Sequence, residues 1–141
     1  MQPELRTPDP AMSNPPLILI VEDNEGSLML ATVMLENEGF QVVGAGSAEE
    51  ARDVLATKTP DLILMDIQLP GMDGLEFTKE LKADSDTAAI PVIALTAQPM
   101  PIYERAARAA GCEGFIAKPW TPESLSREIR AFLATVSPRN Q

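Results

Sequence analysis

The chain has 141 residues, of which 45% are apolar and 23% are charged, a composition typical of a single globular domain. Its net charge of −10 argues against nucleic acid as a direct partner, because phosphate backbones bind to basic surfaces. The sequence contains no histidine and one cysteine, which excludes His-ligated zinc, His-based catalytic triads and an internal disulfide.

The N-terminal segment differs in composition from the rest of the chain. Residues 1–16 contain five prolines and almost no apolar pattern, so we expect a disordered tail there. This segment lacks the apolar stretch of a signal peptide, and no run in the chain approaches the ~20 apolar residues of a membrane span. We therefore expect a cytoplasmic protein without membrane contact, with one domain over 17–135 and a short tail over 136–141.

From residue 17 onward, short apolar runs alternate with helical patterns. The runs are continuously apolar, which is typical of strands in a parallel sheet that is covered on both faces. They predict five strands, at residues 17–21, 41–44, 62–65, 91–95 and 114–117.

The segments between the runs predict five helices. The first covers 26–38, and the second begins with Ser47 and Glu50 at the spacing of a capping box. The third begins near Asp73, and the fourth ends at Gly111, a common C-terminal residue. The fifth has Thr121 as N-cap and Pro122 at the first helical position, and it directs Leu125, Ile129, Phe132 and Leu133 inward.

Five strand–helix units in succession predict an α/β fold with a doubly wound parallel sheet. The chain is too short for a closed barrel of eight such units, which needs ~200 residues or more. We expect a five-stranded, flavodoxin-like sheet in the order 2-1-3-4-5, which binds ligands at the carboxyl ends of its first and third strands.

Acidic residues follow the two strands that meet at this point. Glu22 and Asp23 come directly after the first strand, and Asp66 ends the third. Three carboxylates at one place would repel each other, and a hard divalent cation with oxygen ligands would relieve that repulsion. The residues therefore favour a Mg²⁺ site, although any one of these acids alone is more simply explained as a solvated strand end.

The fourth and fifth strands end in a hydroxyl and an ammonium group. Thr96 closes "VIALT" and Lys118 follows "FIA", so both are expected at the same edge as the acids. A hydrogen-bond donor and a positive charge beside a metal–carboxylate cluster suit a phosphoryl group.

Four stretches of the sequence together resemble the response-regulator receiver domains of two-component signalling. They are "LILIVEDN", "DLILMDIQLPGMDG", "PVIALTA" and "GFIAKP", in the order and spacing of that family. The resemblance covers residues 17 to about 135 and is closest to the single-domain receivers, because the chain ends soon after the fifth helix.

The resemblance implies a role for Asp66 and its neighbours. Asp66 would accept a phosphoryl group from a histidine kinase or a histidine phosphotransferase. Glu22, Asp23 and Asp66 would hold Mg²⁺, with Mn²⁺ as a substitute, and the backbone carbonyl of Gln68 would be a further ligand. Lys118 would bind a phosphoryl oxygen.

The same resemblance implies how the signal leaves the site. Thr96 would move toward the phosphoryl group, and Phe115 occupies the position of the switch aromatic. Together they would relay the change to a downstream protein that the sequence does not identify. Such a chain is a phosphoacceptor rather than an enzyme, with at most self-phosphorylation and self-dephosphorylation activity.

Other kinds of protein share parts of this pattern. A phosphatase with an aspartate nucleophile needs a second acid two residues later, and this chain has Gln68 there. A nucleotide-binding protein would need a P-loop or G-x-G-x-x-G, and neither occurs. A receiver-like interaction module that works without phosphorylation is an alternative, but the presence of all the site residues argues against it. A receiver cut from a hybrid histidine kinase also stays open.

The first helix has an unusual surface, because residues 26–35 carry no charge. At ~100° per residue, Met29 and Val33 fall on the outer side and Leu28 on the flank. Such an apolar stripe suits docking of a kinase helical bundle or a homodimer, although a helix without a partner is also consistent with it. The residues expected to face the sheet are Ser27, Leu30, Ala31, Met34 and Leu35.

Overall fold

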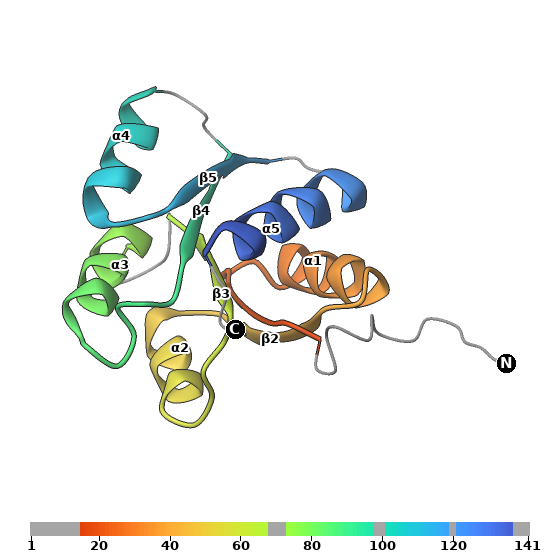
Figure 1. Ribbon diagram of the computed structural model, residues 1–141, viewed down its shortest axis with the longest axis horizontal. Coiled ribbons are helices and arrows are strands. Elements are labelled where there is room, and N and C mark those ends of the chain that lie inside the picture. The colour runs from red at the N-terminus through yellow and green to blue at the C-terminus, as the bar shows by residue number, and fades with distance from the viewer. Residues whose placement is uncertain (1–14, 68–72, 98–100, 119–120, 137–141) are drawn as a thin grey trace, which may run out of the picture.

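The computed structural model describes residues 15–67, 73–97, 101–118 and 121–136. Strands and helices alternate along the chain from β1 to α5 (Figure 1). The elements are β1 Leu17–Val21, α1 Glu25–Asn37, β2 Gln41–Ala45, α2 Ala48–Leu55, β3 Leu62–Asp66, α3 Gly74–Ala83, β4 Val92–Thr96, α4 Pro101–Ala110, β5 Gly114–Ala117 and α5 Pro122–Val136.

The five strands form one parallel sheet in the order β2-β1-β3-β4-β5, which confirms the predicted topology. The strands are apolar on both faces because helices cover both sides of the sheet. Strands β3 and β4 each extend to the polar residue that follows the apolar run, so that Asp66 and Thr96 are the last residues of their strands.

The helices form two layers with the sheet between them (Figure 1). Successive side chains of a strand point to opposite faces, so each strand contributes to two cores. On one face Ile20 and Leu64 pack with residues of α1 and α5. On the other face Leu19 and Met65 pack with residues of α2, α3 and α4.

Among the described residues, four helices begin after residues whose side chains accept a backbone N–H. These N-caps are Asn24 for α1, Ser47 for α2, Asp73 for α3 and the predicted Thr121 for α5, and each accepts from the residue three positions later. Glu50 also supports the start of α2, but it accepts from the backbone N–H of Gly46, at 2.6 Å, rather than from that of Ser47 as in a capping box. Gly111 ends α4 with φ +111°, a conformation that residues with a Cβ rarely adopt.

Helix α1 is rotated from the orientation that we predicted. Leu30 was expected to face the sheet, and its side chain is 58% exposed. Leu28 was expected on the flank, but it is half-buried and packs with Ala31 and Leu35 against the sheet. This buried stripe has the 3-4 spacing of a helix face, and it leaves Met29, Leu30 and Val33 together on the outer side.

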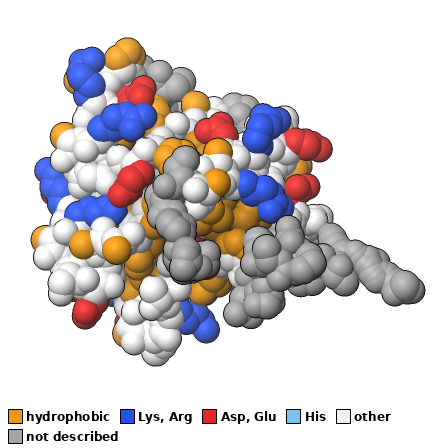
Figure 2. Space-filling model, viewed as in Figure 1, with side chains coloured by type: hydrophobic (Ala, Val, Ile, Leu, Met, Phe, Trp, Pro, Cys, Tyr) orange, Lys and Arg blue, Asp and Glu red, His pale blue; other side chains and the backbone are white. Residues whose placement is uncertain are grey.

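The outer surface carries charges of both signs. Figure 2 shows Lys and Arg interspersed with Asp and Glu on the face it presents, with apolar side chains gathered toward its middle. Among the helices that the structure describes, none has the length and apolar character needed to cross a membrane.

Candidate functional site

The site lies at the carboxyl edge of the sheet, where β1 and β3 run side by side. The register pairs Val21 with Met65, so the next residues along the two strands are Glu22 and Asp66. The backbone N–H of Glu22 donates to the carbonyl of Ala45 at 2.9 Å, which fixes the end of β1 against β2. Strand pairing therefore brings together acids that are more than forty residues apart in the sequence.

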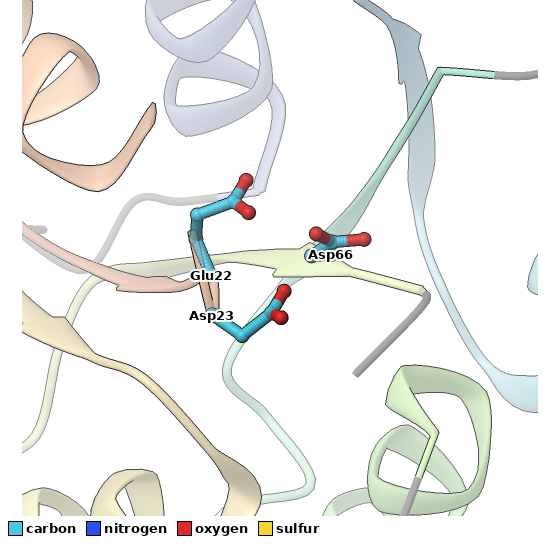
Figure 3. Close-up of side chains that lie close together, drawn as sticks. All are labelled: Glu22, Asp23 and Asp66. Carbon is cyan, nitrogen blue, oxygen red and sulfur yellow. The ribbon is translucent and has the colours of Figure 1, made fainter. Parts of the chain in front are cut away.

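Three carboxylates converge there. Glu22, Asp23 and Asp66 each offer an oxygen atom within 4.8 Å of the others. Figure 3 shows Glu22 and Asp23 leaving the end of β1 in different directions, with Asp66 across from them on β3. Glu22 and Asp66 are 3% and 7% exposed, whereas Asp23 is open to solvent. The cluster thus has a buried part and one arm that is accessible from outside.

Lys118 brings a positive charge to the two buried carboxylates. Its Nζ donates to Oε1 of Glu22 at 2.6 Å and lies 3.7 Å from Oδ2 of Asp66. The backbone N–H of Lys118 donates to the carbonyl of Thr96 at 2.7 Å, which ties the end of β5 to β4. The predicted convergence of Lys118 and the acids is therefore observed, and its pairing with Glu22 is an addition that the sequence did not indicate.

Thr96 and Phe115 lie on the face of the sheet that α2, α3 and α4 cover. Phe115 is paired with Ala94 across β4 and β5, and Thr96 comes two residues further along β4. Residues two apart on a strand share a face, so Thr96 and Phe115 are diagonal neighbours. Thr96 is buried, and Phe115 is half-buried against the core that α2, α3 and α4 cover.

Gly74 also shapes the site, and our sequence reasoning did not single it out. It is the first residue of α3, and its N–H donates to the carbonyl of Ile67 at 3.2 Å. A Cβ built on Gly74 would lie 2.2 Å from the carbonyl oxygen of Asp66. The sequence does contain a signal for this requirement. Glycine directly follows the N-cap Asp73, at a helical position where residues with a side chain are normally accepted.

The three acids fit a hard divalent cation. Mg²⁺ prefers oxygen ligands at about 2.1 Å, which places ligand oxygens roughly 3 to 4 Å from each other. The observed separations of up to 4.8 Å would have to close by roughly 1 to 2 Å, which a change of side-chain rotamer can supply. Lys118 offsets part of the charge of the cluster, which leaves an excess of negative charge for a cation. Gln68, predicted to contribute its carbonyl oxygen, lies outside the described residues.

Comparison with known proteins gives the same family from the sequence and from the structure. The family model of the response regulator receiver domain matches residues 18–130. A curated relative, the polar-differentiation response regulator DivK of Brucella ovis, is 43% identical over 116 residues. That alignment covers 82% of this chain and 94% of the relative.

Two solved structures illustrate the similarity of the fold. A response regulator from Chloroflexus aurantiacus has a TM-score of 0.82 and 31% identity, over 86% of this chain and 99% of its own. The receiver domain of a sensor histidine kinase from Pseudomonas aeruginosa has a TM-score of 0.77 and 30% identity, over 84% of this chain and 97% of its own. The latter structure has a magnesium ion coordinated in the active site cleft.

Proposed function

The chain belongs to the response regulator receiver domain family, and from this premise we propose that it is a phosphorylation-dependent switch with Asp66 as the phosphoacceptor. Receiver domains are signalling modules of two-component systems. The proposal adds the residues that carry the chemistry in this chain, the donor of the phosphoryl group and the route by which the change leaves the site.

One observation carries the proposal. The carboxylate of Asp66 stands at the end of a buried strand, within 4.8 Å of two further carboxylates and 3.7 Å from the ammonium group of Lys118. A carboxylate at 7% exposure is costly to maintain unless nearby groups stabilise it. Lys118 and a bound cation would supply that stabilisation and would also neutralise an incoming phosphoryl group.

The proposed reaction is a transfer between two nucleophiles. A carboxylate oxygen of Asp66 attacks the phosphorus of a phosphohistidine on the partner, and an O–P bond forms as the P–N bond breaks. The bonding electron pair goes to the imidazole nitrogen, which takes up a proton. The product is an acyl phosphate on Asp66, and Lys118 binds one of its oxygens.

Glu22, Asp23 and Asp66 would hold the cation, which we propose to be Mg²⁺, with Mn²⁺ as a substitute. The bound cation supplies charge neutralisation for the phosphoryl oxygens. The chain contributes the preformed acid cluster and excludes water from its buried side. Gln68 stays a predicted ligand through its backbone carbonyl.

The output route would start at Thr96. Its buried side chain is on β4, next to the strand of Lys118, and its hydroxyl would donate to a phosphoryl oxygen. Space vacated by Thr96 would let its diagonal neighbour Phe115 move inward from its half-buried position. A downstream protein would then read the changed surface around β5.

The donor would be a histidine kinase or a histidine phosphotransferase that docks on α1. Met29 and Val33 are 68% and 48% exposed, and Leu30 extends this apolar stripe. The helix begins at Glu25, two residues after Asp23, so a partner bound there is next to the acid cluster. Leu28, also predicted for this surface, contributes less because it is half-buried. A cytoplasmic location is part of the proposal.

Incubation with acetyl phosphate tests the function without a partner protein. We expect Mg²⁺-dependent addition of one phosphoryl group by intact mass, loss of labelling in Asp66→Asn, and loss of labelling in Asp23→Asn because the cation is no longer held. Self-dephosphorylation is then measured as the decay of the label. A chain that is never labelled, yet still binds a partner kinase, would support instead an interaction module that works without phosphorylation.

A further inference from the structure

Helix α1 carries an exposed acid at each end of the apolar stripe formed by Met29, Leu30 and Val33. Glu25 is the first residue of the helix and Glu36 lies in its last turn, and both side chains are exposed. In the part of the chain that the structure describes, neither carboxylate has a hydrogen-bond or ion-pair partner. At about 100° per residue, the two acids fall with Met29 and Val33 within an arc of about 80°. The outer face of α1 is therefore an apolar centre with a carboxylate at each end.

The stability of the helix explains one of these acids but not the other. A carboxylate in the first turn is favoured by the helix dipole, which accounts for Glu25. Glu36 lies at the opposite end, where a negative charge is unfavourable, and the last turn contains no basic residue. That end is closed by Arg130 of α5, which donates to the carbonyl of Glu38 and stacks on Phe40, with Cζ 4.6 Å from the ring centre. Glu36 thus opposes the local stability of α1, which points to a role in binding.

The charge around the stripe decides between a second copy of the chain and a different protein. From residue 15 to residue 51, every charged residue is an acid. Two α1 helices packed antiparallel would place Glu25 of one copy beside Glu36 of the other, and a parallel pair would place each acid beside its counterpart. Like charges in contact weaken association, whereas a protein with a base at each end of an apolar patch would pair with both carboxylates. The charge pattern therefore favours a different protein with basic residues.

We propose that Glu25 and Glu36 are specificity-determining residues, which select a phosphohistidine donor whose apolar docking patch has a lysine or arginine at each end. The two acids are eleven residues apart, so the two bases would be separated by about 16 Å along the helix axis. This inference rests on the proposed function, since the donor occupies the stripe. Charges at the solvated rim of an interface govern the association rate and the choice of partner more than the strength of the complex.

Glu36 gives the more specific test, because it is at the end of α1 away from the acid cluster. The probe is a phosphorylated histidine phosphotransferase that labels wild type. At low salt, Glu36→Lys should lower kcat/KM for phosphotransfer at least about fivefold, and Glu36→Gln or Glu25→Gln about two- to fivefold. These differences should shrink at about 0.5 M salt, because salt screens exposed charges. Glu36→Lys should also melt about 1 to 3 °C higher than wild type, so damage to the fold cannot explain the slower transfer.

Asp53→Lys is the matched control. Asp53 is an exposed acid in the last turn of α2, on the opposite side of the sheet, and its substitution changes the net charge by the same amount. It should raise the melting temperature about as much as Glu36→Lys does and leave phosphotransfer at the wild-type rate. Labelling by acetyl phosphate, which needs no docking, should match wild type in Glu36→Lys and in Asp53→Lys.

Charge reversal on the donor tests the pairing directly. When the base at one end of the donor's patch is changed to glutamate, Glu36→Lys should accept the phosphoryl group from it at least about fivefold faster than wild type does. The inference is overturned if Glu36→Lys accepts at the wild-type rate from the original donor, or if Asp53→Lys slows transfer equally. It is also overturned if sedimentation shows wild-type dimers that Met29→Glu dissociates, since the stripe would then hold a second copy. Wild type that takes no label from acetyl phosphate would refute the proposed function, and the inference with it, by a separate measurement.

Discussion

Gly74 and Asp66 are in contact through their backbones, and a Cβ on Gly74 would lie 2.2 Å from the carbonyl oxygen of Asp66 and 2.8 Å from Cα of Ile67. Both obstacles are main-chain atoms, so a side-chain rotation cannot relieve the clash. The first turn of α3 is thereby fixed against the end of β3. The backbone of Asp66 and the start of α3 are therefore packed without room for a side chain between them.

Gly74→Ala is expected to destabilise the fold by about 1–3 kcal/mol, the usual cost of forcing extra atoms into a packed site. Urea unfolding with circular dichroism detection measures the free energy. Gly26→Ala is the matched control, because Gly26 is in the first turn of α1 and its nearest obstacle is the side-chain oxygen of Asn24 at 3.4 Å. It should be neutral or stabilising by up to about 1 kcal/mol. Equal stability of the two variants would contradict the contact.

The amino end of the sheet depends on Lys82. Its Nζ donates to the carbonyls of Ala88 and Ile90 and to the carboxylate of Glu113, at 3.1, 2.7 and 3.0 Å. Lys82→Met would leave these acceptors without their donor and should lower the free energy of unfolding by about 1–3 kcal/mol. Lys79→Met, an exposed position on the same helix, should change it by less than about 0.5 kcal/mol. A Lys82→Met protein as stable as the control would show that water replaces the ammonium group.

The buried thiol of Cys112 makes the free energy of unfolding decrease as the pH becomes alkaline. Burial raises the pKa of its thiol from 9.0 to about 11, and contact with the hydroxyl of Thr78 offsets part of that rise. In the unfolded chain the Cys112 thiol ionises near pH 9, whereas in the folded chain it keeps its proton at that pH. This contribution is therefore complete below about pH 9 and is lost as the pH rises toward about 11. Wild type should lose more stability over this range than Cys112→Ala, and parallel curves in urea unfolding would refute the assignment.

The topology could be predicted because continuous apolar runs and helical periodicity leave few alternatives for a chain of this length. The edge that carries Asp66 and Thr96 followed from that topology. Contacts across the edge could not be predicted, since the pairing of Glu22 with Lys118 depends on side-chain reach between residues 96 positions apart. Gly74 was missed because its requirement comes from the backbone of another element.

The predicted orientation of α1 was wrong for a different reason. Residues 26–35 are all uncharged, so hydrophobic periodicity distinguishes poorly between one face and its neighbour. Packing decided the orientation. Leu28 lies over Gly44, where a Cβ would come within 2.9 Å of its side chain, and Leu30 turns outward. The contact between a helical leucine and a glycine on a strand is a tertiary feature, which the helical pattern alone does not contain.

The apolar stripe of Met29, Leu30 and Val33 predicts a defect that depends on the donor. Met29→Glu with Val33→Glu should slow phosphotransfer by at least about tenfold from a phosphorylated histidine phosphotransferase that labels wild type, because docking would bury two carboxylates without partners. Labelling by acetyl phosphate, which needs no docking, should match wild type. Ile102→Glu makes the same kind of change at an exposed residue of α4 and serves as control. Unchanged transfer in the double variant would place the docking surface elsewhere.

The central claim is that Asp66 itself carries the phosphoryl group. Acetyl-phosphate-labelled protein can be reduced with borohydride, which converts an aspartyl phosphate to homoserine, and the modified residue can then be located by peptide mass spectrometry. The account predicts homoserine at position 66, dependent on Mg²⁺ and absent after Asp23→Asn. Homoserine at position 23, or labelling that persists in Asp66→Asn, would contradict it.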